Sequence, residues 1–514
     1  MDLSDTPEQA RYRETVRAWL AEHRDAAPPA SGSNEDAEYI AARRRWQDAL
    51  AEGGLAGVTW PPEYGGQGRG PIEQVIVNQE ISAAGVPGIL DTIGVGMLGP
   101  TIIGHGTDAQ KGRYLGPMLH GDEVWCQLFS EPAAGSDLAG IQARARRQDD
   151  SSWRLSGQKV WTTNAQFASF GLLLARTDPD VPKHKGLTMF VVPMDAEGVT
   201  IRGLRQISGE AEFNEVFFDD VRLEADAVVG GVNDGWRTAL TTLMFERLTI
   251  GLGTEGLGYK EGRFARALAT NAHARRDPEV RRRLGEIATE LIAVKFGGYR
   301  ALTALQRGQI PGPEAGLAKV TLVNAAIAAG ELIADTLGPD ALEDGGEWAY
   351  MISFLPGLKT AGGTEEILRN TIGERVLGLP PEPRLDKGIP FAELLAVKFG
   401  GYRALTALQR GQIPGPEAGL AKVTLVNAAI AAGELVADTL GPDALEPGGE
   451  WSYMISFLPG LKTAGGTEEI LRNTIGERVL GLPPEPRLDK GIPFAELRSR
   501  EREAAAATAG VAAR

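Results

Sequence analysis

A near-identical internal duplication constrains this chain more than any other feature. Residues 292–394 recur as residues 395–497, and the two copies differ at only four positions. Solenoid repeats have periods of about 20 to 50 residues and usually diverge more than this. A recent tandem duplication, or an error in building the gene model, therefore explains the repeat better than a solenoid does.

Composition limits which partners the protein can bind and in which cellular compartment it is expected. The 514 residues carry a net charge of −15, and an acidic surface repels a phosphate backbone, so nucleic-acid binding is not expected. Cys126 is the single cysteine and cannot form an intramolecular disulfide. The apolar stretch 320–337 is interrupted by Glu331 and Asp335, so no membrane span is expected. The scattered histidines predict no metal site, and the chain is expected to be cytoplasmic.

The order of sequence patterns predicts an α+β protein with three structural domains. Residues 1–121 show helical patterns and predict an N-terminal helical domain. Short apolar runs separated by Gly, Asp, Asn and Pro predict a middle β-barrel or sandwich over 122–230. Long amphipathic runs, among them 278–307 and 314–337, predict a C-terminal helical bundle over 231–394. The duplicate, 395–497, and an Ala/Arg-rich tail, 498–514, follow.

One glycine motif is misleading. Gly94 to Gly99 match the dinucleotide-binding pattern G-x-G-x-x-G letter for letter. That motif needs a preceding strand and a βαβ unit, whereas here it lies inside the helix predicted over 89–104. A dinucleotide site of this type is therefore not expected.

Two segments of the β zone carry groups suited to a planar cofactor. Residues 127–137, Gln-Leu-Phe-Ser-Glu-Pro-Ala-Ala-Gly-Ser-Asp, form a strand that ends in a turn with hydroxyls and free backbone N–H groups. Residues 157–164 follow, and Trp161 and Thr163 share one face of a strand there. An aromatic ring beside a hydroxyl could stack on a planar cofactor and form a hydrogen bond to it.

These segments, the helical–β–helical order and Gly362 to Asn370 together resemble the acyl-CoA dehydrogenase family over about residues 5–384. The resemblance implies an FAD held between the β domain and the C-terminal domain. It implies that Gln127, Leu128, Phe129, Ser130, Gly135, Ser136, Trp161, Thr162, Thr163, Thr364 and Glu366 bind this cofactor. Ser136 would approach the pyrophosphate, and Thr364 and Glu366 would reach the flavin from the C-terminal domain.

One family segment is missing from the chain. The family's Arg-x-x-Phe-Gly, which often touches the flavin of a neighbouring subunit, is replaced at 274–283 by Ala-Arg-Arg-Asp-Pro-Glu-Val-Arg-Arg-Arg. The cross-subunit contact is therefore unassigned. The resemblance still implies a homo- or hetero-oligomer, either a dimer or a tetramer.

The dehydrogenation that this resemblance implies begins with removal of a proton from the carbon next to a thioester carbonyl. It needs a carboxylate in a dry site as the base, because desolvation makes a carboxylate a stronger base. In one branch of the family this Glu precedes the Gly-Thr of the closing motif, where this chain has Gly362. In the branch similar to isovaleryl- and long-chain-type enzymes it lies on the first long C-terminal helix, where this chain has Glu246.

Helical spacing also favours Glu246. Positions i−3, i+4 and i+7 are Leu243, Ile250 and Gly253, which place the carboxylate on an apolar stripe. A buried ion pair with Arg247 or another arginine is the structural alternative. With Gly362 in the other position, the interpretation as a base is preferred.

The resemblance implies FAD-dependent dehydrogenation of an acyl-CoA to a 2,3-enoyl-CoA, with electrons passed to an electron-transfer flavoprotein or a similar acceptor. An acyl-CoA oxidase and a non-catalytic partner subunit remain alternatives. A nitroalkane-oxidase-like enzyme would carry Asp as its base, and the net charge argues against a DNA-associated relative. The first copy, with Gly362 to Thr364, is expected to complete the site rather than Gly465 to Thr467 of the second.

Overall fold

The computed structural model describes residues 5–29, 32–252, 274–306, 315–343 and 346–380, and also Leu268, Asn271, Gly312 and Phe391. All of them belong to one compact unit, Met1–Phe391, which includes most of the first copy of the duplication. The second copy, 395–497, and the tail, 498–514, lie outside the described residues.

Three of the N-terminal helices begin where the sequence supplies a side-chain cap, at Thr6, Asp36 and Thr107. The N-terminal helices are α1 (Pro7–His23), α2 (Ala37–Glu52), α3 (Pro71–Ala84), the π-helical turn η3 (Gly94–Leu98), α4 (Gly99–His105) and α5 (Asp108–His120). Thr6 and Thr107 each form a capping box with a glutamine three residues later, which satisfies backbone N–H groups of the first turn. The helix expected from residue 89 begins only after Asp91, and its first part is the π-helical turn.

The middle domain is one mixed sheet. Its strands are β1 (Trp125–Leu128), β2 (Arg144–Arg147), β3 (Trp153–Thr163), β4 (Phe170–Arg176), β5 (Leu187–Pro193), β6 (Val199–Leu204), β7 (Phe213–Leu223) and β8 (Val228–Val229). The order is β6-β7-β3-β2-β4-β5-β8, and β1 pairs with β4 in parallel. The predicted β zone is therefore confirmed, with eight strands in a single hydrogen-bonded sheet.

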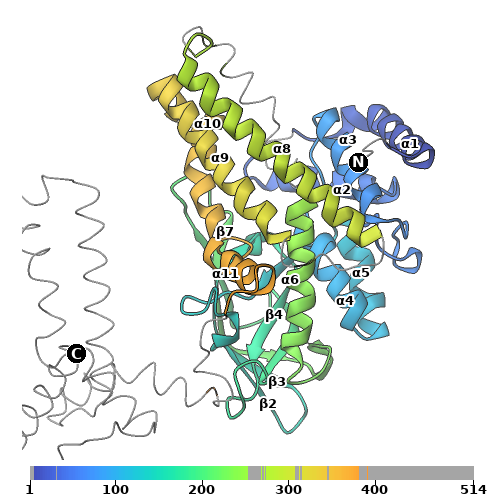
Figure 1. Ribbon diagram of the computed structural model, residues 1–514. Helices are drawn as coiled ribbons and strands as arrows, with labels where there is room; N and C mark the ends of the chain where they lie inside the picture. Colours follow the sequence, from blue (N-terminus) through green and yellow to red (C-terminus); the bar gives the residue numbers. More distant parts are fainter. Residues whose placement is uncertain are drawn as a thin grey trace, which may run out of the picture. The chain divides into compact units, whose positions relative to one another are not determined.

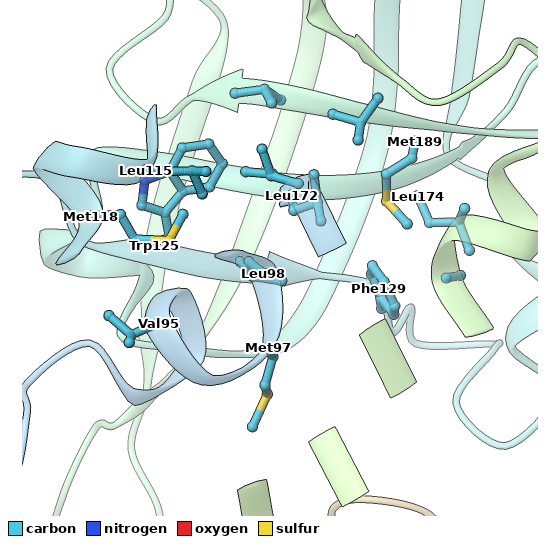
Figure 2. Packing of buried hydrophobic residues seen from close by; sticks show 14 of the residues in the cluster. Val95, Met97, Leu98, Leu115, Met118, Trp125, Phe129, Leu172, Leu174 and Met189 are labelled. Carbon is cyan, nitrogen blue, oxygen red and sulfur yellow. The ribbon is translucent and has the colours of Figure 1, made fainter. Parts of the chain in front are cut away.

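Side chains of β4 and β5 are buried on both faces, as expected for central strands. Leu172 and Leu174 join the cluster that contacts the N-terminal helices, whereas Leu173 and Ala175 join the cluster on the other face. Figure 2 shows the helix-facing cluster, in which Leu98 and other side chains of the helices meet residues of the sheet. This cluster joins the first two domains into one core.

The C-terminal domain is helical, as predicted. Its helices are α6 (Gly235–Leu252), α8 (Pro278–Gln306), α9 (Ala315–Leu337), α10 (Glu347–Phe354) and α11 (Glu365–Arg375). The long helices α8 and α9 pack side by side (Figure 1). Gly316–Leu342 is long and apolar enough to cross a membrane, but α9 packs against α8, α10 and α11 and forms the core of this domain.

Candidate active site

The structure brings the two predicted cofactor segments together. The backbone N–H of Val160 donates to the carbonyl of Ser130 at 2.9 Å. Lys159, from the same strand, donates through Nζ to the carbonyl of Phe129 at 2.9 Å. The turn after β1 is therefore fixed against β3, although the segments are separated in sequence by some thirty residues.

A buried ion pair completes this junction. Lys159 Nζ lies 2.8 Å from Glu131 Oε1, and both side chains are almost completely excluded from solvent. The Glu131 carboxylate also accepts the backbone N–H groups of Gln142 and Ala143. Burial lowers the pKa of Lys159, while Glu131 opposes this shift. The pair was not singled out from the sequence, although both residues lie inside the two quoted segments.

Trp161 is exposed between two buried residues of strand β3, Val160 and Thr162. Its side chain is 60% accessible, and its φ of 60° lies in the left-handed region that non-glycine residues rarely adopt. The pairing of β3 with β7 is irregular between Lys159 and Thr162, so a bulge redirects this residue. The indole packs edge-on against Phe213 and leaves much of its surface free.

The other predicted cofactor residues in the middle domain divide by position. Gly135 and Ser136 are exposed on the turn, and Gln127, Ser130 and Thr163 are partly buried. The remaining three, Leu128, Phe129 and Thr162, are buried, and the first two belong to the hydrophobic cores on opposite faces of the sheet.

Glu246 lies on α6 and meets the middle domain through Gln127. Gln127 Nε2 donates to Glu246 Oε2 at 3.1 Å. Among the residues that the structure describes, no Lys, Arg or His lies within ion-pair distance of this carboxylate, Arg247 included. Leu243, one turn earlier, packs against the shared core, while Gly253 and the side chain of Ile250 fall outside the described residues.

Burial raises the pKa of the Glu246 carboxyl above its usual value. The amide of Gln127, and then the charges of Arg247 and Lys319, oppose this shift. The geometry therefore provides a carboxylate with a strengthened affinity for a proton, hydrogen-bonded to a neutral amide.

The glycines of the misleading motif allow α6 to approach this site. A Cβ added to Gly96 would lie 2.9 Å from Thr249 Oγ1, and Thr249 donates to the carbonyl of Gly96 at 3.1 Å. A Cβ on Gly99 would lie 2.1 Å from the ring of Trp60. Close packing between the π-helical turn and its neighbours therefore explains these glycines.

Asp91 joins this turn to strand β1. Its carboxylate accepts the backbone N–H of Gly94 at 2.7 Å and that of Trp125 at 3.0 Å. Complete burial raises the pKa of Asp91 to about 7. Sequence reasoning missed this residue, because a lone aspartate before a glycine-rich segment gives no signal of such a role.

The Gly-Gly-Thr turn leads into α11. Gly362 and Gly363 have φ values of 66° and 92°, a conformation that favours glycine. Thr364 caps α11, and its hydroxyl accepts the backbone N–H of Ile367. Glu366 is exposed in the first turn of this helix.

Comparisons with known proteins identify the family. The family models "Acyl-CoA dehydrogenase, N-terminal domain", "middle domain" and "C-terminal domain" match residues 6–122, 126–221, and 233–377 with 392–480. The chain therefore belongs to the acyl-CoA dehydrogenase family, whose members are FAD-dependent oxidoreductases.

Individual relatives agree with this assignment. The acyl-CoA dehydrogenase IpdE1 of Mycobacterium tuberculosis is 39% identical, with 73% of this chain and 98% of that protein covered. A solved structure described as the Tcur3481-Tcur3483 steroid ACAD has a TM-score of 0.65 at 28% identity, over 74% of this chain and all of that one. The ChsE4-ChsE5 complex of Mycobacterium tuberculosis has a TM-score of 0.62 at 29% identity, with the same coverage.

The arrangement around Trp161 fits the flavin of this family. An exposed indole, which is suited to stacking, lies at a bulge next to the turn that carries Ser130. A buried polar atom on the strand that leads into this turn, Gln127 Oε1, has no hydrogen-bond partner in the described part of the chain. Such an atom calls for a partner, and the polar edge of a flavin could supply one.

Proposed function

We propose that this chain catalyses α,β-dehydrogenation of an acyl-CoA thioester with Glu246 as the base. The observation that carries the proposal is the carboxylate of Glu246, which burial makes more basic and which accepts the Gln127 amide without a paired cation among the described residues. A structural ion pair, the alternative considered from the sequence, would require such a cation within about 4 Å, and none of the described residues supplies it.

The chain's own groups account for the proton transfer. Glu246 removes the proton from the carbon next to the thioester carbonyl, and the released electron pair forms the Cα–Cβ double bond as a hydride leaves the β-carbon. Bound FAD supplies the hydride acceptor. Polarisation of the thioester carbonyl is assigned to backbone N–H groups, with the N–H of Gly362 as the candidate in the C-terminal domain.

The cofactor site is proposed to follow the predicted residues. Trp161 and Thr163 would cover the ring, Gln127 and Ser130 would line it, and Ser136 would face the pyrophosphate. Leu128, Phe129 and Thr162 are buried, so we assign them contacts through their backbone or a supporting role. Gly135 would let the chain approach closely, and Thr364 and Glu366 would contribute from the C-terminal domain.

The relatives suggest the first substrates and partners to test. One matched structure is described as a steroid dehydrogenase, so a CoA ester that carries a bulky ring system heads the list of substrates. We place the enzyme in the cytoplasm as an oligomer that delivers its electrons to an electron-transfer flavoprotein or a similar acceptor. Its site would be of the isovaleryl- and long-chain-like type, with the base on α6.

Anaerobic titration of the purified protein with a panel of acyl-CoA esters tests the proposal. We expect at least one ester to bleach the flavin absorbance, with slow reoxidation in air and fast reoxidation by an electron-transfer flavoprotein. Fast reoxidation by oxygen, with production of hydrogen peroxide, would identify the oxidase alternative instead.

A second candidate is a subunit that acts only with a partner chain. Two of the similar structures are described by pairs of names, Tcur3481-Tcur3483 and ChsE4-ChsE5, which favours a complex of two different chains. In that case the isolated protein would bind FAD weakly or remain oxidised with every ester. Addition of the partner chain would then restore reduction.

A further inference from the structure

Lys319 connects three parts of the C-terminal domain at the proposed site. It lies in the first turns of α9, and its Nζ donates to the carbonyl of Gly363 at 2.7 Å and to that of Lys359 at 3.2 Å. One ammonium group therefore holds both ends of the short segment that contains Gly362. Neither the family's closing motif nor the predicted site residues include this lysine.

Lys319 fixes the C-terminal end of this segment. Gly362 and Gly363 have no side chains, and both adopt left-handed φ values. The start of the segment is held by the backbone N–H groups of Thr360 and Ala361, which both donate to the carbonyl of Gly357. At the other end, the carbonyl of Gly363 accepts the hydrogen bond from Lys319, directly before the Thr364 cap.

The same ammonium faces carboxylates from two helices. Glu246 comes from α6, and Glu365 and Glu366 come from the first turn of α11. Glu365 is engaged elsewhere, because Arg369 lies 2.6 Å from its Oε1 and Lys359 lies 3.8 Å from its Oε2. Burial lowers the pKa of Lys319, and the charge of Lys319 in turn lowers the pKa of Glu246.

We propose that Lys319 is a positioning residue that fixes the Gly362–Gly363 turn beside the substrate thioester. Its hydrogen bonds set where the backbone N–H of Gly362 points. This inference rests on the proposed function, since the role serves the dehydrogenation assigned above.

The duplication supplies a matched control. Lys422 stands in the second copy with the same neighbours in sequence as Lys319. The full-length variants K319M and K422M therefore carry the same substitution in the same local sequence. If Lys319 acts as proposed, only the first variant changes the reaction.

The test is the limiting rate of flavin reduction, measured anaerobically by stopped flow over a range of concentrations of an ester that reduces the wild type. For K319M, compared at equal FAD content, we expect a limiting rate lower by roughly tenfold or more, because the turn is misplaced. The dissociation constant of the ester, obtained from the same data, should change much less. K422M should match the wild type in both respects.

A purely structural role would lower the FAD content without lowering the limiting rate of the FAD-loaded protein. K319R should restore this rate only in part, because its planar guanidinium keeps donors but not the geometry of the ammonium group. If K319M does not retain FAD, K319Q and K422Q replace the pair, since glutamine keeps a donor and loses the charge.

A wild-type limiting rate in K319M or K319Q would overturn the proposal, as would an effect confined to the Lys422 variants. A wild type that no ester reduces would instead contradict the proposed function. The two failures are therefore distinguishable.

Discussion

The amide of Gln127 and the carboxylate of Glu246 meet at 3.1 Å, although 119 residues separate them in sequence. Gln127 lies on strand β1 of the middle domain, and Glu246 lies on helix α6 of the C-terminal domain. The sheet that carries the predicted flavin segments thus also orients the proposed base. Close packing of α6 on the π-helical turn at Gly96 helps to hold this geometry.

Replacing Gln127 by Leu should shift the pH dependence of flavin reduction. The amide stabilises the ionised carboxylate, so its loss raises the pKa of Glu246 further above the usual range. A base works only when deprotonated, and the rate falls as the pH drops through this pKa. We expect the acid limb of the pH profile, the range in which the rate falls on acidification, to move to higher pH by about one unit. Gln148→Leu, on the surface, serves as a control and should leave the profile unchanged. An unchanged acid limb would show that the hydrogen bond from Gln127 does not affect the pKa of Glu246.

Trp161 should contribute strongly to FAD binding. Its exposed indole is held outward at a strained backbone position, an arrangement typical of functional sites. Loss of ring stacking in Trp161→Ala should weaken FAD binding by about tenfold, as expected for the loss of about 1.4 kcal/mol. Reconstitution of the apoprotein, followed by flavin fluorescence, measures this change. Trp161→Phe should retain most of the affinity, and equal affinity for all three proteins would remove Trp161 from the site.

The Lys159–Glu131 pair should be essential for the stability of the turn after β1. Lys159→Met leaves a buried carboxylate without its partner, which typically costs about 3–5 kcal/mol. Urea unfolding followed by tryptophan fluorescence should show this loss, together with reduced FAD content. In the double variant Lys159→Met/Glu131→Gln the uncompensated charge is gone, so part of the stability should return. A single variant as stable as the wild type would refute the structural role of the pair.

Phe391, at the end of the compact unit, provides a test of which copy packs on the middle domain. Its ring lies 3.8 Å from the Arg176 guanidinium, its N–H donates to Val181, and its side chain is 4% exposed. Phe391→Ala should therefore lower the free energy of unfolding by about 3 kcal/mol, as for other large core truncations. The same change at Phe494, the equivalent position in the second copy, should have little effect. Equal losses in both variants would indicate that the copies exchange.

The sequence predicted the three-domain order and several helix limits, because capping and periodicity are local signals. The helix predicted over 278–307 was found at Pro278–Gln306, and that over 314–337 at Ala315–Leu337. The predicted start of one helix at residue 89 was wrong. This helix begins only after Asp91, whose carboxylate accepts the backbone N–H of Gly94.

Contacts between distant segments could not be read from local patterns. Residues far apart in sequence are joined by the parallel pairing of β1 with β4, by the Lys159–Glu131 pair and by the hydrogen bonds from Lys319. Glu246 was predicted as the base because its helix has an apolar stripe and because Gly362 occupies the alternative position. No such pattern marked Asp91 or Lys319, since each acts on the backbone of another segment.

Anaerobic single-turnover reduction of the Glu246→Gln variant tests the central claim most directly. Glutamine keeps the size of the side chain and its ability to form hydrogen bonds but cannot accept the α-proton. With FAD content equal to that of the wild type, we predict flavin reduction slower by at least about 10²-fold. Reduction at the wild-type rate with FAD content unchanged would contradict the assignment of Glu246 as the base.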